Sequence, residues 1–259
     1  MRWKHVAKPW FPMNMIHALR TVLGSLSFSI LTPNHTGNYF IRAFFLPDSI
    51  KKYGPAFMFI CSITFVLCVA LAGLGFGGKF ILGDLIEWPW YAPYISIGTC
   101  IIASVFVIRL KWFFRQARKI KVLKDWVPDL DIYGDWKYGS KLLVLTLIRF
   151  IIMCTDEVLL IYLLMGEVDW FITFQAVTAY YFVVSFIPHF VFSAILVRGA
   201  VGVWLFGMIG IPEAVALGVI TLSWFLGVAL HALIGIPFFL QVKPEMRKRQ
   251  LEKIQETKA

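Results

Sequence analysis

The segment PAFMFICSITFVLCVALAGLGFGG, residues 55–78, contains no Asp, Glu, Lys or Arg. About 20 apolar residues cross a bilayer as a helix, so this segment predicts a transmembrane helix. The uncharged segments 88–108 and 214–242 predict two more, over 88–108 and 212–242. The chain is 59% hydrophobic with a mean hydropathy of +0.75, above the usual apolar share of soluble domains. We therefore expect an all-α fold, a polytopic transmembrane helical bundle.

Basic residues gather in the connections between alternate spans. Residues 1–12 hold three, Lys51 and Lys52 precede the first span, residues 109–141 hold nine and residues 243–259 hold six. The positive-inside rule predicts that 109–141 is a cytoplasmic basic loop, that 243–259 is a cytoplasmic tail, and that both termini are cytoplasmic. The opposite connections carry Asp84, Glu87, Glu167, Asp169 and Glu213 against Lys79 alone.

The net charge of +10 needs no nucleic-acid partner, because basic residues on the cytoplasmic face attract anionic lipid. Residues 109–124 place apolar side chains near one helical face, which favours an interfacial helix over an ordinary solvated connection. The four cysteines and five histidines show no metal or redox spacing, so we expect no metal, no cofactor and buried cysteines. His231 is expected to bond to a neighbouring helix.

Residues 15–46 contain the polar stretch LTPNHTGNYFIRAFF, residues 31–45. Both flanks carry cytoplasmic charge, so we expect a re-entrant hairpin that enters from the cytoplasm, breaks and returns. Non-helical backbone survives at membrane depth where it is buried in protein or lines a wet cavity. The expected break, at Pro33, Gly37 and Asn38, should therefore face a polar space. A pair of helices lying on the membrane surface is the alternative.

Residues 170–208 repeat this design from the opposite side. The segment is too long for one crossing and short for two, its flanks are acidic, and we expect an interrupted hairpin with breaks at Pro188 and Gly199. The shared pattern is a proline, a histidine and then an arginine: Pro33, His35 and Arg42, then Pro188, His189 and Arg198. Two such segments entering from opposite faces indicate an inverted-repeat transporter with a site near the midplane, with chance similarity as the alternative.

A fourth transmembrane helix is predicted over 142–165 despite its charges. Within the apolar segments the arginines are Arg20, Arg42, Arg149 and Arg198, and the carboxylates are Asp156 and Glu157. Unpaired charge is costly in a membrane, and the guanidinium fork binds phosphate oxygens in a bidentate way, so an anionic headgroup would balance the excess. The expected lipid phosphate-binding residues are Arg42, Arg198, His35 and His189.

Asp156, Glu157 and Arg149 are the expected intramembrane charge partners. One of the two carboxylates should pair with Arg42 or Arg198 on another element. Arg149 and Asp156 are seven residues apart, about 10 Å along a helix, so they should not pair with each other. The alternative for Arg20 and Arg149 is that their side chains reach the cytoplasmic interface.

LRTVLGSLSFSILTPNHTGNYFIRAFFL (19–46), FIPHFVFSAILVRGAVGVWLF (186–206) and LGVITLSWFLGVALHALIGIPFFL (217–240) resemble the membrane domain of the lysylphosphatidylglycerol synthase and flippase-like family, in its Bacteroidetes-type form. The resemblance covers residues 3–240. Pro33, Gly37 and Arg42 match the family's first segment, whereas Asn38 stands where that segment usually has an acid. Members usually begin with further spans, so the chain is expected to be amino-terminally short.

The resemblance implies a bacterial inner-membrane protein that binds anionic phospholipid or polyprenyl-phosphate lipid and moves it between leaflets. No stretch outside the apolar segments is long enough for the family's aminoacyl-transferase domain, so synthase activity is not expected. Two alternatives stay open at this stage: an intramembrane enzyme acting on a lipid phosphate, and a noncatalytic scaffold subunit. A homo-oligomer or a membrane partner protein is compatible with each of the three.

Overall fold

The computed structural model describes residues 1–29, 32, 37–78, 115–116, 119, 136–187 and 191–241. Over these residues the chain is helical and contains no strand, which confirms the predicted all-α class. The helices are α1 (Arg2–Ala7), α2 (Met15–Ser29), α3 (Gly37–Phe44), η2 (Lys51–Tyr53), α4 (Gly54–Gly75), α8 (Trp136–Met165), α9 (Trp170–Phe186), α10 (Val191–Gly207), α11 (Glu213–Trp224) and η4 (Phe225–Ala229). Helical structure continues from η4 to Gln241.

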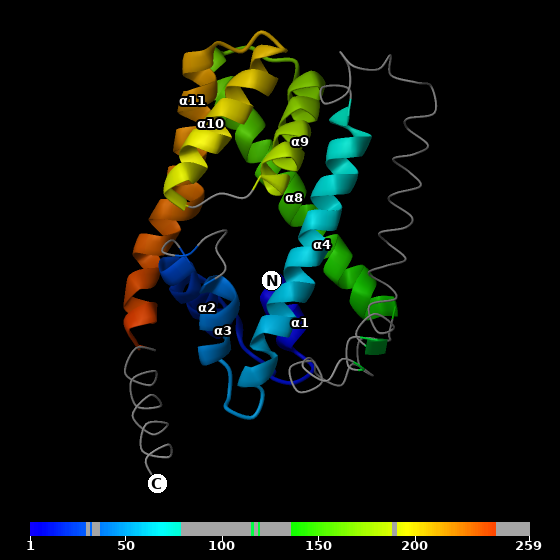
Figure 1. Ribbon diagram of the computed structural model, residues 1–259, viewed down its shortest axis with the longest axis vertical. Coiled ribbons are helices and arrows are strands. Elements are labelled where there is room, and N and C mark those ends of the chain that lie inside the picture. Colours follow the sequence, from blue (N-terminus) through cyan, green and yellow to red (C-terminus); the bar gives the residue numbers. More distant parts are fainter. Residues whose placement is uncertain are drawn as a thin grey trace.

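The long helices α4 and α8 connect two ends of the molecule (Figure 1). Helices α1, α2 and α3 gather toward the lower end of the view, and α9, α10 and α11 toward the upper end. Helix α3 runs from the middle toward the lower end, whereas α10 runs from the middle toward the upper end. The molecule therefore contains two short helix pairs, α2–α3 and α9–α10, that approach its middle from opposite ends.

Each end has its own hydrophobic core. The lower core is centred on α1 and the first half of α4, with Trp3, Phe57 and Ile60 buried in it. The upper core joins α8 to α11 and contains Tyr180 and Phe206, both almost fully buried. The buried residues of the described chain thus form two hydrophobic clusters.

Two helices are long and apolar enough to cross a membrane, Lys51–Gly75 and Glu213–Gln241. They correspond to the predicted spans 55–78 and 212–242. Only 22% of the most apolar part of the second helix is buried within the molecule, so most of that helix faces outward. The predicted span 88–108 and the tail 243–259 lie outside the described residues, as does most of the loop 109–141.

Two predicted segments have boundaries that differ from those observed. The helix predicted over 142–165 begins six residues earlier, at Trp136, because its first turns pack on α1 through Tyr138. The Tyr138 hydroxyl lies 3.1 Å from the His5 carbonyl oxygen and 3.0 Å from that of Val6. The segment predicted as an interrupted hairpin over 170–208 consists of α9 and α10, which pack against each other.

Glycine allows α4 and α9 to approach closely. A Cβ atom added at Gly73 of α4 would overlap the Phe182 side chain of α9. Small residues at such positions let helix backbones meet in a membrane bundle. This contact fixes α9 along the upper half of α4.

Candidate functional site

Arg2 is buried against α4, and one of its hydrogen-bond donors has no partner. Its side chain is 9% exposed, and Nη2 donates a hydrogen bond to the carbonyl oxygen of Cys61. Its Nε atom is buried without a partner. The guanidinium carbon lies 5.6 Å from the centroid of the Phe65 ring, which contributes a cation–π contact. A buried guanidinium thus keeps one donor that nothing in the described chain satisfies.

A second arginine shares the same aromatic ring. The guanidinium carbon of Arg149, on α8, lies 5.2 Å from the Phe65 centroid. Arg149 and Arg2 are close enough to repel each other electrostatically. The Arg149 side chain is exposed, so this part of the site is open to the surroundings while Arg2 is enclosed.

Arg42 completes the group from α3. Its Nε donates to Ser25 Oγ on α2 and to Asn38 Oδ1 one helical turn earlier, both at 3.1 Å, and its guanidinium carbon lies 5.4 Å from the Trp3 ring centroid. The charges of Arg42, Arg2 and Arg149 all act on Cys61. We call these three side chains the arginine cluster.

No carboxylate of the described residues pairs with Arg2 or Arg149. An ion pair of Lys51 with Asp48, 2.8 Å apart, lies instead near the start of α4. Two of the three arginines, Arg2 and Arg149, therefore have no counter-charge among the described residues. Unpaired positive charge of this kind is unfavourable away from water. The cluster is therefore suited to an anion, and a phosphate matches the geometry of guanidinium donors.

A different polar group lies inside the upper core, and we call it the Glu157 centre. Glu157 of α8 is 2% exposed. Its Oε1 atom accepts hydrogen bonds from the Tyr181 hydroxyl at 3.1 Å and from Ser223 Oγ at 2.8 Å. Its Oε2 atom is buried and has no partner. Three helices, α8, α9 and α11, thus meet at one half-satisfied carboxyl group.

Two residues with buried donors that lack a partner interact electrostatically with this carboxyl group: Tyr180, through its hydroxyl, and Arg198, whose Nε is unbonded. A third such donor, Trp224 Nε1, belongs to the residue that follows Ser223 on α11. The charge of Arg198 acts on Glu157. The two side chains nevertheless do not form a direct ion pair.

The predicted residues divide between the two groups. The structure does not bring Arg42 and Arg198 together: Arg42 belongs to the arginine cluster, and Arg198 lies beside the Glu157 centre. The two carboxylates also differ, since Glu157 is buried whereas the adjacent Asp156 is exposed. Glu157 is thus the carboxylate that shares an environment with Arg198, although they are not in contact.

The predicted hairpin breaks are partly described. Gly37 begins α3, and its N–H donates to Thr32 Oγ1 at 2.8 Å; a Cβ there would lie 2.8 Å from both Phe28 and Thr32. Asn38 binds Arg42, as given above. Gly199 is not a break, because it lies within the continuous helix α10 and packs near Leu217. Pro33, His35, Pro188 and His189 lie outside the described residues.

Sequence reasoning missed Arg2, Tyr181 and Ser223. Arg2 was assigned to the cytoplasmic basic start, and only the folding of α1 against α4 shows that it is buried. Tyr181 and Ser223 lie in uncharged stretches of sequence, where no local signal separates them from other polar residues. His231 is also corrected: it contacts the Leu226 carbonyl oxygen of its own helix at 2.7 Å, because η4 displaces the regular helical bonds there.

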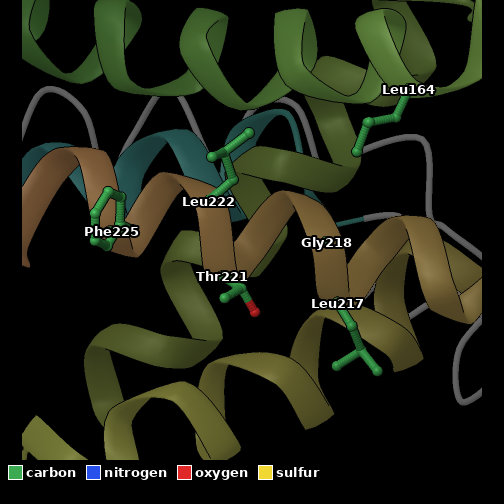
Figure 2. Close-up of a pocket in the computed structure, with 6 residues that line it drawn as sticks. All are labelled: Leu164, Leu217, Gly218, Thr221, Leu222 and Phe225. Carbon is green, nitrogen blue, oxygen red and sulfur yellow. The ribbon is translucent and has the colours of Figure 1, made fainter.

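An open apolar groove of ≈ 590 Å³ runs along α11 and η4. Figure 2 shows Leu164 reaching it from α8, with the other labelled residues along α11 and η4. The lining consists of Leu164, Leu217, Gly218, Thr221, Leu222 and Phe225. This groove has no charged group, so it is not an anion site.

Comparison of the chain with family models, with curated proteins and with solved structures finds no match.

Proposed function

We propose that the chain is a multi-pass membrane protein that binds the phosphate of an anionic lipid and moves that lipid between leaflets. The observation that carries the proposal is the arginine cluster, in which Arg2 and Arg149 share Phe65 and no carboxylate among the described residues pairs with either. The lipid is a phospholipid or a polyprenyl phosphate, which present the same chemical group. This is also the function that the resemblance to the lysylphosphatidylglycerol synthase and flippase-like family implies.

The outer surface supports a lipid environment. Large apolar side chains are exposed along α8 and along the helix that follows η4. On α8 they are Val144, Leu147, Ile148, Ile151, Ile152, Leu159, Leu163 and Leu164. Continuous apolar surface of this kind is unusual in soluble monomers and is typical of contact with lipid or a partner.

Charge placement along the molecule supports the same proposal. Lys51, Lys52, Lys137 and Lys141 lie near the first turns of α4 and α8, toward the lower end of Figure 1. Glu167, Asp169 and Glu213 lie at the opposite end, where α8 ends and α9 and α11 begin. Under the positive-inside rule, the lower end is the cytoplasmic face of a bacterial inner membrane.

The opposite directions of the two helix pairs also support the proposal. The pair α2–α3 approaches the middle from the cytoplasmic end, and α9–α10 approaches it from the other (Figure 1). Paired segments of opposite direction are the arrangement that inverted-repeat transporters use. Because Arg42 lies on α3, a movement of this pair would carry one of the three phosphate-binding side chains.

The test replaces the exposed member of the cluster in protein reconstituted into vesicles. Arg149→Gln removes one charge-assisted interaction, which is about 1.5–3 kcal/mol, so affinity for phosphatidylglycerol should fall about tenfold or more. The affinity of Arg149→Lys should lie between those of the parental protein and Arg149→Gln, because lysine keeps the positive charge but lacks the planar guanidinium group that binds phosphate in a bidentate way. Binding is measured by lipid titration, and transbilayer movement by accessibility of a fluorescent lipid to an external quencher.

The matched control is Arg20→Gln, which removes an exposed arginine of α2 outside the cluster. It should leave binding and movement at the parental level. Parallel vesicles with polyprenyl phosphate and with phosphatidylcholine separate the two anionic lipids from a zwitterionic one. Equal binding of all three lipids, or an unchanged affinity in a folded Arg149→Gln protein, would show that the cluster does not hold the headgroup.

A further inference from the structure

The Glu157 centre is not used by the proposed lipid site. Glu157 lies among Cys154, Val158 and Ile161, three fully buried or nearly fully buried residues of the same face of α8. The hydrogen bonds from Tyr181 and Ser223 both go to Oε1, and Oε2 receives none. An ionised carboxylate in such surroundings normally has a cation or several donors on both oxygens. A carboxyl group that carries a proton needs neither.

Titratable or polar groups from four helices bond to Glu157 or interact with it electrostatically. They are Cys154 and Asp156 on its own helix α8, Tyr180 and Tyr181 on α9, Arg198 on α10, and Ser223 on α11. Arg149, about two turns before Glu157 on α8, adds a positive charge that acts on Tyr181. Among these groups, Arg198 is the cation that acts on Glu157 itself.

Arg198 acts electrostatically on Glu157 but does not bond to it. Its Nε atom is buried and unbonded, and no direct ion pair joins it to Glu157. The unbonded Oε2 of Glu157 and the unbonded Nε of Arg198 are complementary, since one accepts and the other donates. Two buried groups of this kind would pair if the carboxyl group were charged and the helices allowed it.

We propose that Glu157 is a proton-binding site: Oε2 carries a proton in the arrangement seen here, and after release of that proton to water the carboxylate forms a direct ion pair with Arg198. The proton is the only species that is gained or lost. This pairing moves α10 relative to α8. The presence or absence of the proton on Glu157 therefore selects between two packings of helices α8 to α11. This inference does not depend on the identity of the transported molecule.

The helix beside the site has a feature that suits such a movement. Ser223 and Trp224 end α11, and the π-helical turn η4 starts at the next residue, Phe225. Single π-helical turns inside α-helices are frequent at functional sites, where they allow a local change of register. A shift at η4 would alter the Ser223 contact with Glu157 without unfolding the helix.

Infrared spectroscopy of the purified full chain in vesicles tests the proposal, because a protonated carboxyl group has a carbonyl band separate from that of a carboxylate. The parental protein should show this band and lose it as the pH is raised. Glu157→Gln should remove the band at neutral pH, where ordinary exposed carboxyl groups are ionised. The matched control Asp156→Asn changes the adjacent, exposed carboxylate and should leave the band in place.

Arg198→Gln tests the second half of the proposal. Without Arg198 the ionised carboxylate loses the cation that would stabilise it, so the band should persist to a higher pH than in the parental protein. Circular dichroism and gel filtration establish that each variant is folded. If Glu157→Gln does not fold, Glu157→Asp serves instead and should shift the band rather than remove it.

A band that survives in folded Glu157→Gln or disappears in Asp156→Asn overturns the proton site. An identical pH dependence in Arg198→Gln overturns the ion pair. Neither outcome affects lipid binding at the arginine cluster, which is measured separately.

Discussion

At the scale of single residues, burial decides which charged side chains matter, and neighbours in sequence differ sharply. Asp156 and Glu157 are adjacent, yet one is exposed and the other lies in the upper core. Asn38, which stands where the resembling family usually has an acid, accepts a hydrogen bond from Arg42 at 3.1 Å. A neutral amide thus helps to orient Arg42 without adding a charge of its own.

His5 provides a pH-dependent contact between α1 and α8. Its ring stacks on Tyr138 with centroids 4.3 Å apart, and Nε2 lies 3.1 Å from the Tyr138 carbonyl oxygen. Burial lowers the pKa of His5 from its usual value; Lys141 and Lys8 lower it further, and the bond to Tyr138 opposes them. The folded chain therefore binds this proton less readily than the unfolded chain does. Stability from His5 is complete above the unfolded pKa, about 6.5, and is lost as the pH falls through it toward the folded pKa.

We expect the melting temperature of the detergent-solubilised protein to fall as the pH is lowered from about 7 to about 5. In His5→Gln this decrease in melting temperature should be smaller. The matched control His231→Gln removes an exposed histidine and should retain the parental pH dependence. If His5→Gln and the parental protein lose the same stability over this range, His5 does not carry the effect.

At the scale of helices, the helix predicted over 55–78 is observed as α4, from Gly54 to Gly75, because a long uncharged apolar run favours one continuous helix. The inward face of α8 was not predictable. In water an apolar stripe marks the buried face of a helix, but the outward face of α8 is also apolar, at Ile151, Ile152 and Leu159 among others. The sequence therefore could not show which of Asp156 and Glu157 points inward, nor that Arg198 lies with Glu157 rather than with Arg42.

The contact between α4 and α9 gives a prediction at this scale. Gly73→Ala places a methyl group against Phe182, and overpacking of this kind costs about 1–3 kcal/mol. Gly207→Ala is the matched control, because a Cβ at that helical position meets no atom within 4 Å. Chemical unfolding in detergent should show a lower free energy of unfolding for Gly73→Ala and no loss for Gly207→Ala. Equal stability of the two variants would mean that α4 and α9 are not in close contact.

At the scale of the whole molecule, two cores place two charged groups apart along α4 and α8. The lower group is cationic and partly open at Arg149, which suits an anionic headgroup. The upper group is enclosed around Glu157, which suits a proton. Composition and charge placement anticipated a helical chain with its cations toward one end, but only the three-dimensional structure shows that Arg2 joins Arg42 and Arg149.

Native mass spectrometry of the full chain purified in mild detergent tests the central claim most directly, because it detects a bound lipid and identifies its headgroup. We predict that the parental protein and Arg20→Gln retain an anionic, phosphate-bearing lipid, and that Arg149→Gln retains about tenfold less. Retention of zwitterionic and anionic lipids in the proportions of the surrounding membrane, unchanged in Arg149→Gln, would contradict the account.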